Sequence, residues 1–296
     1  MQARGAGIIY LLTILVLLGC LSARETRAEN DPGLPVFVSI LPQAFFVERI
    51  GGNRVTVDVM VQPGQSPHTY APSPKQMVRL ARAKVYFRIN APFENGFIPK
   101  LQSAVPGIEI IDTTRGIVLE KMDDHNNTDD HHHDEDLDTH IWLDPLLVKK
   151  QAAIIRDGLS AIDPAGRLYF ENNFIRFAGE LDNLHNRLSL ALAPLKGKSF
   201  FVFHPAFGYF AKAYGLRQVA VETGGKQPSA RHIAQLIEKA REEKVKVIFA
   251  QPQFSTKSAE TIARAIDGVV IALDPLAGDY LANMEKIAAA IEKALQ

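Results

Sequence analysis

Short apolar runs alternate with amphipathic stretches along the chain from residue 36 onward. The runs predict strands at Val36–Ile40, Val55–Val61, Lys84–Ile89, Gly107–Asp112, Phe200–Phe203, Arg217–Val221, Val245–Ala250 and Val269–Leu273. The stretches predict helices at Gln43–Ile50, Pro74–Ala81, Pro145–Ile162, Pro164–Ala193, Ala206–Tyr214, Ser229–Glu243, Thr256–Ile266 and Tyr280–Leu295. Strands separated by helices are typical of parallel sheets with helices on both faces.

The helix expected from Pro164 lies between two α/β patterns of similar rhythm. It has only Gly179 as an interruption, so about 30 residues would extend on the order of 45 Å. The fold class predicted is therefore α/β, with two lobes that each hold a mainly parallel sheet flanked by helices and are joined by one long rigid helix. The expected domains are an N-terminal lobe (29–163), the linking helix (164–194) and a C-terminal lobe (195–296).

The N-terminus predicts export. Arg4 precedes the apolar run Ile8–Leu18, which is too short to span a bilayer comfortably, so residues 1–28 are expected to be a cleaved signal peptide. Cleavage before Glu29 competes with lipidation at Cys20, because Leu17–Cys20 resembles a lipoprotein signal. The protein is therefore expected in the periplasm, either free or lipid-anchored, and as a monomer.

Composition narrows the chemistry. Cys20 is the only cysteine, so any metal in the mature protein must be held by His, Asp, Glu or water. With 33 basic and 33 acidic residues, the net charge is zero, which gives no indication of a nucleic-acid partner.

An acidic, histidine-rich run occupies Asp123–Asp138 (DDHNNTDDHHHDEDLD). It holds four of the nine histidines, interleaved with carboxylates: His125, His131, His132 and His133. Imidazole and carboxylate are common ligands of divalent transition metals. A loop at 121–137 is expected to lack a single ordered structure without metal, and it is interpreted either as a solvated charge run or, preferably, as an accessory metal collector.

Four other metal-capable residues follow predicted strands or the acidic insertion: His68, His140, His204 and Asp274. Ligands of open parallel sheets bind at the carboxyl ends of strands, so these side chains are expected to converge between the lobes. Three imidazoles and one carboxylate suit a tetrahedral zinc site. His185 and His232, within predicted helices, are interpreted as ordinary surface or packing residues.

Five motifs carry a resemblance across the mature chain, in the same order: PHTYAPSPKQ (67–76), DTHIWLDP (138–145), FHPAFGYFAKAYGL (203–216), VETGGKQPS (221–229) and QPQFS (251–255). Together they resemble the zinc and manganese solute-binding proteins of bacterial ABC importers. The resemblance implies two lobes bridged by a rigid helix, a metal ion held between them by His68, His140, His204 and Asp274, delivery to an ABC membrane permease, and no catalysis.

The metal implied by this resemblance is Zn²⁺ as transported ligand. Manganese receptors of this family usually carry Glu where this chain has His204, and a His-rich insertion is typical of zinc members. Some zinc members have a carboxylate just before the first histidine, where this chain has Pro67. That difference leaves either Asp274 or a water as the fourth ligand.

Other functions remain open from the sequence. The alternatives are a manganese receptor of the same family, a zinc-dependent hydrolase, and an adhesin or extracellular metal buffer. The hydrolase lacks support, because there is no HExxH motif and no motif places a carboxylate base beside the site. For the receptor, metal affinity is expected to decrease as the pH drops below the ordinary imidazole pKa of about 6.5. The rigid helix is expected to limit the movement of the lobes.

Overall fold

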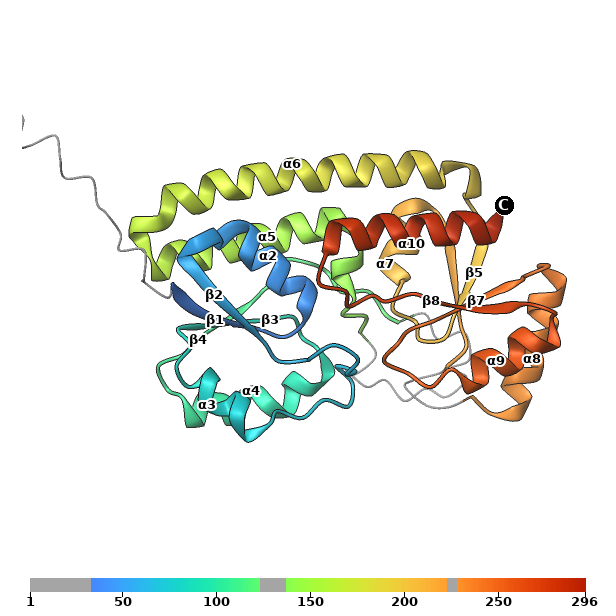
Figure 1. The fold of residues 1–296 in the computed structure, drawn as a ribbon, viewed down its shortest axis with the longest axis horizontal. Coiled ribbons are helices and arrows are strands. Elements are labelled where there is room, and N and C mark those ends of the chain that lie inside the picture. Colours follow the sequence, from blue (N-terminus) through green and yellow to red (C-terminus); the bar gives the residue numbers. More distant parts are fainter. Residues whose placement is uncertain (1–32, 123–136, 223–227) are drawn as a thin grey trace, which may run out of the picture. The chain divides into compact units, whose positions relative to one another are not determined.

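The computed structural model describes residues 33–122, 137–222 and 228–296, which contain two four-stranded sheets (Figure 1). The first sheet has the order β2 (Val55–Val59), β1 (Leu34–Val38), β3 (Val85–Arg88), β4 (Glu109–Asp112). The second has the order β6 (Arg217–Ala220), β5 (Ser199–Val202), β7 (Val247–Ala250), β8 (Val269–Ala272). Every neighbouring pair is parallel, so the predicted fold class is confirmed.

Helices connect the strands within each sheet and between the two sheets. They are α2 (Leu41–Gly51), α3 (Pro74–Leu80), α4 (Pro92–Ala104), α5 (Pro145–Ile162), α6 (Arg167–Leu192), α7 (Gly208–Tyr214), α8 (Ala230–Glu242), α9 (Lys257–Ala265) and α10 (Tyr280–Leu295). Short 3₁₀ turns are η1 (Gly52–Arg54), η3 (Ile141–Leu143), η4 (Pro164–Gly166) and η5 (Ala193–Leu195). In Figure 1, α3 and α4 lie on one side of the first sheet and α2 and α5 on the other.

Several helix starts follow local chemistry that the sequence shows. Ser73 and Gln76 form a reciprocal capping box at α3, with Pro74 at its first position. Ser229 accepts a hydrogen bond from the main-chain N–H of His232 and so caps α8. His232 lies in the first turn of α8, as expected for a helical residue.

The long helix is shorter than its predicted range. α6 has 26 residues and is flanked by η4 and η5, so the continuous segment from Pro164 to Leu195 contains a 3₁₀ turn at each end. The Asp163 side chain accepts from the main-chain N–H of Gly166, and it therefore caps η4 rather than α6. The prediction of one long helix between the two sheets is confirmed, while α6 begins three residues later and ends one residue earlier than predicted.

Helix α4 was missed by the sequence patterns. Its buried side chains Phe93, Phe97, Ile98 and Leu101 have helical spacing. Gly96 and Pro99 lie on its exposed face, where neither interrupts packing. Because both residues are usually read as helix breakers, they hid a helix whose buried face is regular.

The largest apolar core extends from the first sheet to the second. Its buried members include Phe46 of α2, Phe177 of α6 and Tyr280 of α10. The rings of Phe46 and Tyr280 meet edge to face, with centroids 4.9 Å apart. A smaller core lies among β5–β8, α8 and α9. The two sheets are thus joined by shared packing as well as by the chain itself.

Two expectations lie outside the described residues. The signal peptide, including Cys20, falls in residues 1–32, and the accessory histidines His125, His131, His132 and His133 fall in residues 123–136. Within the described ranges, no helix combines the length and apolar character needed to cross a membrane.

Candidate metal centre

Three histidines from distant parts of the sequence meet where strands end. His68 lies in the loop after β2, and His204 lies two residues after the end of β5. His140 is the N-cap residue of η3, just before α5. The carboxyl ends of parallel strands are where open α/β sheets bind ligands, so this convergence agrees with the expectation from chain order.

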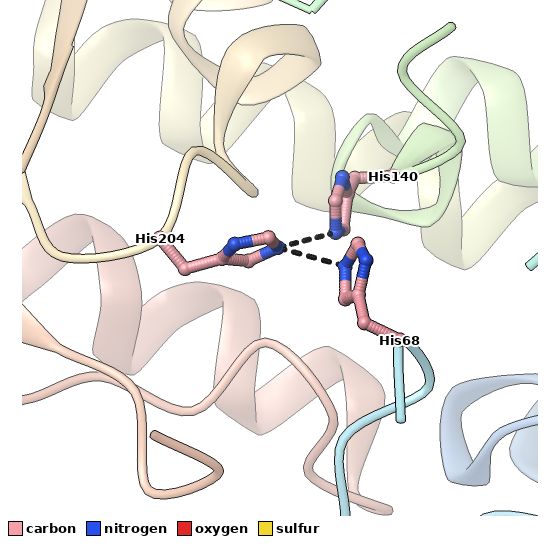
Figure 2. Close-up of side chains that lie close together, drawn as sticks. All are labelled: His68, His140 and His204. Atoms are coloured by element: carbon pink, nitrogen blue, oxygen red, sulfur yellow. Dashed lines mark hydrogen bonds between the residues drawn. The ribbon is translucent and has the colours of Figure 1, made fainter. Parts of the chain in front are cut away.

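The three imidazoles present their Nε2 atoms to one another (Figure 2). His204 Nε2 lies 3.1 Å from His68 Nε2 and 3.3 Å from His140 Nε2. One ring nitrogen from each histidine lies within 4.8 Å of the others. Two ligands of a tetrahedral zinc ion with Zn–N bonds of about 2.0 Å are separated by about 3.3 Å, so both spacings from His204 are compatible with zinc ligation.

Two carboxylates fix two of the rings. Asp138 Oδ1 lies 2.7 Å from His140 Nδ1, and Glu222 Oε1 lies 2.5 Å from His204 Nδ1. A carboxylate accepts hydrogen bonds only, so each ring carries its proton on Nδ1 and leaves the Nε2 lone pair free. Such carboxylate–imidazole pairs set the tautomer and orientation of metal-binding histidines. Both rings are thus prepared to donate to a cation at the point where the Nε2 atoms meet.

The main chain of His204 is also fixed. Gln251 accepts from the His204 N–H at 3.0 Å and donates to the His204 carbonyl at 2.8 Å. Phe254 stacks on the His204 ring, with centroids 4.6 Å apart and planes inclined by 26°. This ring therefore has little freedom in either position or tilt.

Burial keeps two of the histidines neutral. It lowers the pKa of His68 to about 3, assisted by the nearby His204 and His140 and opposed by Asp138. Burial and His140 likewise place the pKa of His204 well below 6.5, again opposed by Asp138. Neutral imidazoles are the metal-binding form, so the site favours a cation over protons.

Asp274 lies near this site but is engaged elsewhere. Its Oδ1 accepts from Gln253 Nε2 at 2.8 Å and from the Leu276 N–H at 2.9 Å. Among the residues that the structure describes, the group of mutually close ligand atoms contains the three histidines and not Asp274. The next residue, Pro275, accepts a 2.8 Å hydrogen bond from Trp142 Nε1, which ties the Asp274 loop to η3.

The space at the centre is small. A cavity of about 20 Å³ is lined by the three histidines and by mainly apolar neighbours: Pro67, Trp142, Gln253, Phe254, Pro275 and Leu276. Because one water needs on the order of 10–15 Å³, the cavity accommodates an ion or a water but not an ester or a peptide. Its dimensions therefore suit the binding of a single ion.

Sequence reasoning missed Asp138 and Glu222 as orienting groups, although both lie in the quoted motifs. The Asp-x-His spacing of Asp138 and His140 is one available signal, since the aspartate side chain also accepts from the main-chain N–H of His140 at 2.9 Å. Glu222 requires the pairing of β5 with β6. Val202 pairs with Ala220, which brings the residues after each strand, His204 and Glu222, side by side.

His185 is not part of this centre. It lies partly buried on α6, with its ring 5.5 Å from that of Tyr214 and its Nε2 3.5 Å from Ser189 Oγ. These contacts agree with the packing role expected for it from the sequence.

Comparison with known proteins also indicates a zinc-binding protein. Residues 36–294 match the family described as "Zinc-uptake complex component A periplasmic". The chain is 30% identical over 268 residues to the high-affinity zinc uptake system protein ZnuA of Yersinia pestis, covering 83% of this chain and 84% of that protein. It is 28% identical over 289 residues to ZnuA of Bacillus subtilis strain 168, covering 94% of this chain and 90% of that protein.

A longer relative and two crystal structures extend the comparison. Zinc-binding lipoprotein AdcA of Streptococcus pneumoniae strain R6 is 29% identical over 294 residues, which are 93% of this chain but only 58% of AdcA. A crystal structure of ZnuA has a TM-score of 0.84 and 40% identity, covering 89% of this chain and all of that one. A zinc-bound ZnuA with residues 138–173 of its own numbering deleted has a TM-score of 0.83 and 39% identity, with coverage of 89% and 98%.

These findings place the chain in a class of two-lobed metal-binding proteins with a site at the strand ends. The chain belongs to the family of periplasmic zinc-uptake complex component A proteins. The members of this family are components of a zinc-uptake complex and not enzymes.

Proposed function

We propose that this protein is a high-affinity zinc receptor, which captures Zn²⁺ outside the cytoplasmic membrane and delivers it to an ABC permease. The observation that carries the proposal is the convergence of three Nε2 atoms at 3.1 and 3.3 Å. Two of those rings are oriented by Asp138 and Glu222. The zinc-uptake relatives support the transport context, and the permease partner follows from the resemblance to receptors of ABC importers.

The proposed ligands are His68, His140 and His204, with Asp274 or a water as the fourth. The present hydrogen bonds of Asp274 Oδ1 to Gln253 and Leu276 favour water, unless the carboxylate turns toward the histidines. Replacing Asp274 with Asn separates the two, since an amide is a poor zinc ligand but can still accept the bond from Leu276. Unchanged affinity in this variant indicates water, and a large loss indicates Asp274.

Zinc is preferred over manganese on chemical grounds. Three converging imidazoles suit Zn²⁺, whereas Mn²⁺ favours oxygen ligands and six-fold coordination. A manganese receptor of the same family is therefore the weaker alternative. A zinc hydrolase is weaker still, because the chain belongs to a family of zinc-uptake components and its sequence has no HExxH motif.

The proposal includes a course of maturation and a domain plan. Residues 1–28 direct export, with Cys20 as the alternative site of lipid attachment, and the mature protein acts as a monomer in the periplasm. The lobes at 29–163 and 195–296 flank the linking helix at 164–194, and the run at 121–137 collects zinc with low affinity. Mass spectrometry of protein isolated from cells distinguishes cleavage before Glu29 from lipidated Cys20.

The test is zinc binding by the mature protein with and without residues 123–136, measured by elemental analysis and by competition with a chelator. One tight zinc per chain is expected in both forms, and replacement of His68, His140 and His204 together by Ala should abolish it. His185→Ala is the matched control, because it removes a helical histidine outside the centre. Tight binding that survives the triple replacement would show that the site is elsewhere.

A further inference from the structure

The segment just before the histidine-rich run pairs with the last residues of that run. The Asp138 N–H donates to the Glu120 carbonyl at 2.8 Å, and Lys121 forms an isolated antiparallel bridge with Leu137. We call these four residues, Glu120, Lys121, Leu137 and Asp138, the neck. The neck therefore ends at the carboxylate that orients His140, which makes it the structural link between the run and the metal centre.

One hydroxyl from the second lobe holds both strands of the neck. Tyr209 of α7 accepts from the Glu120 N–H at 2.9 Å and donates to the Asp138 carbonyl at 2.9 Å. The side chain is buried, and burial raises the pKa of Tyr209 to about 12, so its hydroxyl keeps the proton that it donates. Lys212, one turn along α7, pairs with the carboxylate of Glu120.

The same helix also shapes the place of the Asp138 side chain. A Cβ added to Gly208 would lie 2.8 Å from Asp138 Oδ2, closer than such contacts occur. Glycine at the start of α7 thus allows the carboxylate to sit against the helix. Asp138 is held at its carbonyl by Tyr209 and accommodated at its carboxylate by Gly208, while Oδ1 accepts from both the N–H and Nδ1 of His140.

We propose that Tyr209 is a positioning residue of the metal centre. Its hydroxyl fixes the neck, the neck fixes Asp138, and Asp138 turns His140 Nε2 toward the metal. Tyr209 touches no proposed ligand, and it lies in the second lobe whereas the neck leads from the first sheet. The inference rests on the proposed function, in that His140 must be a metal ligand for its orientation to matter.

The test compares Tyr209→Phe with Tyr214→Phe in the full mature chain. Both residues are buried on α7, and the Tyr214 hydroxyl has no hydrogen-bond partner within the described ranges, so its variant controls for the loss of a hydroxyl. The readouts are the dissociation constant of the tightest zinc, by chelator competition, and the visible absorption of Co²⁺ bound in place of zinc. The histidine-rich run is the same in both variants and cancels in the comparison.

Tyr209→Phe should weaken the tight zinc site by about ten-fold, the lower end of the losses seen when groups behind metal ligands are removed. It should also change the Co²⁺ spectrum, while Tyr214→Phe matches the parent in both. A Tyr209→Phe variant that melts at a lower temperature but keeps the parent's zinc affinity and spectrum would overturn the inference, because the hydroxyl would then be merely structural. A parent protein without a tight zinc site would instead overturn the proposed function.

Discussion

At the scale of single residues, the neutral histidines determine how zinc binding depends on pH. Three imidazoles of ordinary pKa would each have to release a proton below pH about 6.5, and log Kd would rise by up to about three per pH unit. His68 has a pKa of about 3, and that of His204 is lowered well below 6.5. These two rings are already deprotonated in mildly acidic solution, so they do not contribute to this slope.

We therefore predict that zinc affinity depends only weakly on pH. As the pH is lowered from about 7 to about 5, log Kd should rise by no more than about one per pH unit. The measurement is competition with a chelator whose own protonation is corrected at each pH. The sequence-based expectation of a loss of affinity below pH about 6.5 assumed imidazoles of ordinary pKa, and the lowered pKa values of His68 and His204 remove that assumption for these two rings. A slope near three would contradict the lowered pKa values.

The three histidines that converge could be predicted at this scale, but the carboxylates that orient two of them could not. Each histidine is recognisable from its motif and from its place after a strand or the insertion. The role of Glu222 depends on which strand pairs with β5, and that of Asp138 on a side chain turning back toward His140. Asp274 follows β8 as predicted, but its place after the strand does not determine its partners. Its Oδ1 accepts hydrogen bonds from Gln253 and Leu276.

At the scale of elements, α6 is the longest helix among the described residues, and its exposed glycine offers a test. Gly179 lies on its exposed side, and a Cβ added there meets no atom within 4 Å. Ala should therefore fit without strain and stabilise the helix, since glycine within a helix costs about 0.5–1 kcal/mol relative to alanine.

We predict that Gly179→Ala raises the free energy of unfolding by about 0.5–1 kcal/mol in chemical denaturation and leaves zinc affinity unchanged. Gly179→Pro is the contrasting variant, because it removes a main-chain hydrogen bond and clashes with the preceding turn, at a cost of about 3 kcal/mol or more. A destabilised Gly179→Ala would mean that the helix interior is not as open as its surroundings indicate.

Elements with one regular buried face were predictable, and those that carry helix-breaking residues were not. α5 and α10 follow from their apolar spacing, whereas α4 was hidden by Gly96 and Pro99 on its exposed side. The ends of α6 were misjudged because Asp163–Pro164 favours a first turn without specifying whether it is 3₁₀ or α. Local sequence signals where a helix starts, but it does not determine whether the terminal turn is 3₁₀ or α.

At the scale of the whole described molecule, the shared core opposes a wide movement of the lobes. α2 contacts both α6 and α10, and the ring of Phe46 packs 6.0 Å from that of Phe177 and 4.9 Å from that of Tyr280. Arg187 of α6 also pairs with Glu285 of α10 at 2.7 Å. Wide opening of the lobes would expose several of these buried aromatic side chains, each at a cost of about 1.5–3 kcal/mol.

This cost determines what zinc can change. Moving a two-state equilibrium from 1:99 to 99:1 takes about 5.5 kcal/mol of differential binding, and exposing two or three aromatic side chains consumes a similar amount.

We therefore predict that X-ray scattering curves of the metal-free and zinc-loaded parent superimpose. Phe46→Ala should lower stability by about 3–5 kcal/mol and make the two curves diverge. Tyr280→Phe is the control, because its hydroxyl lacks a hydrogen-bond partner in the described part of the chain and its ring is kept. A parent whose scattering changed greatly on zinc binding would show that the lobes move despite the shared core, and that the energy comes from contacts formed only in the closed state.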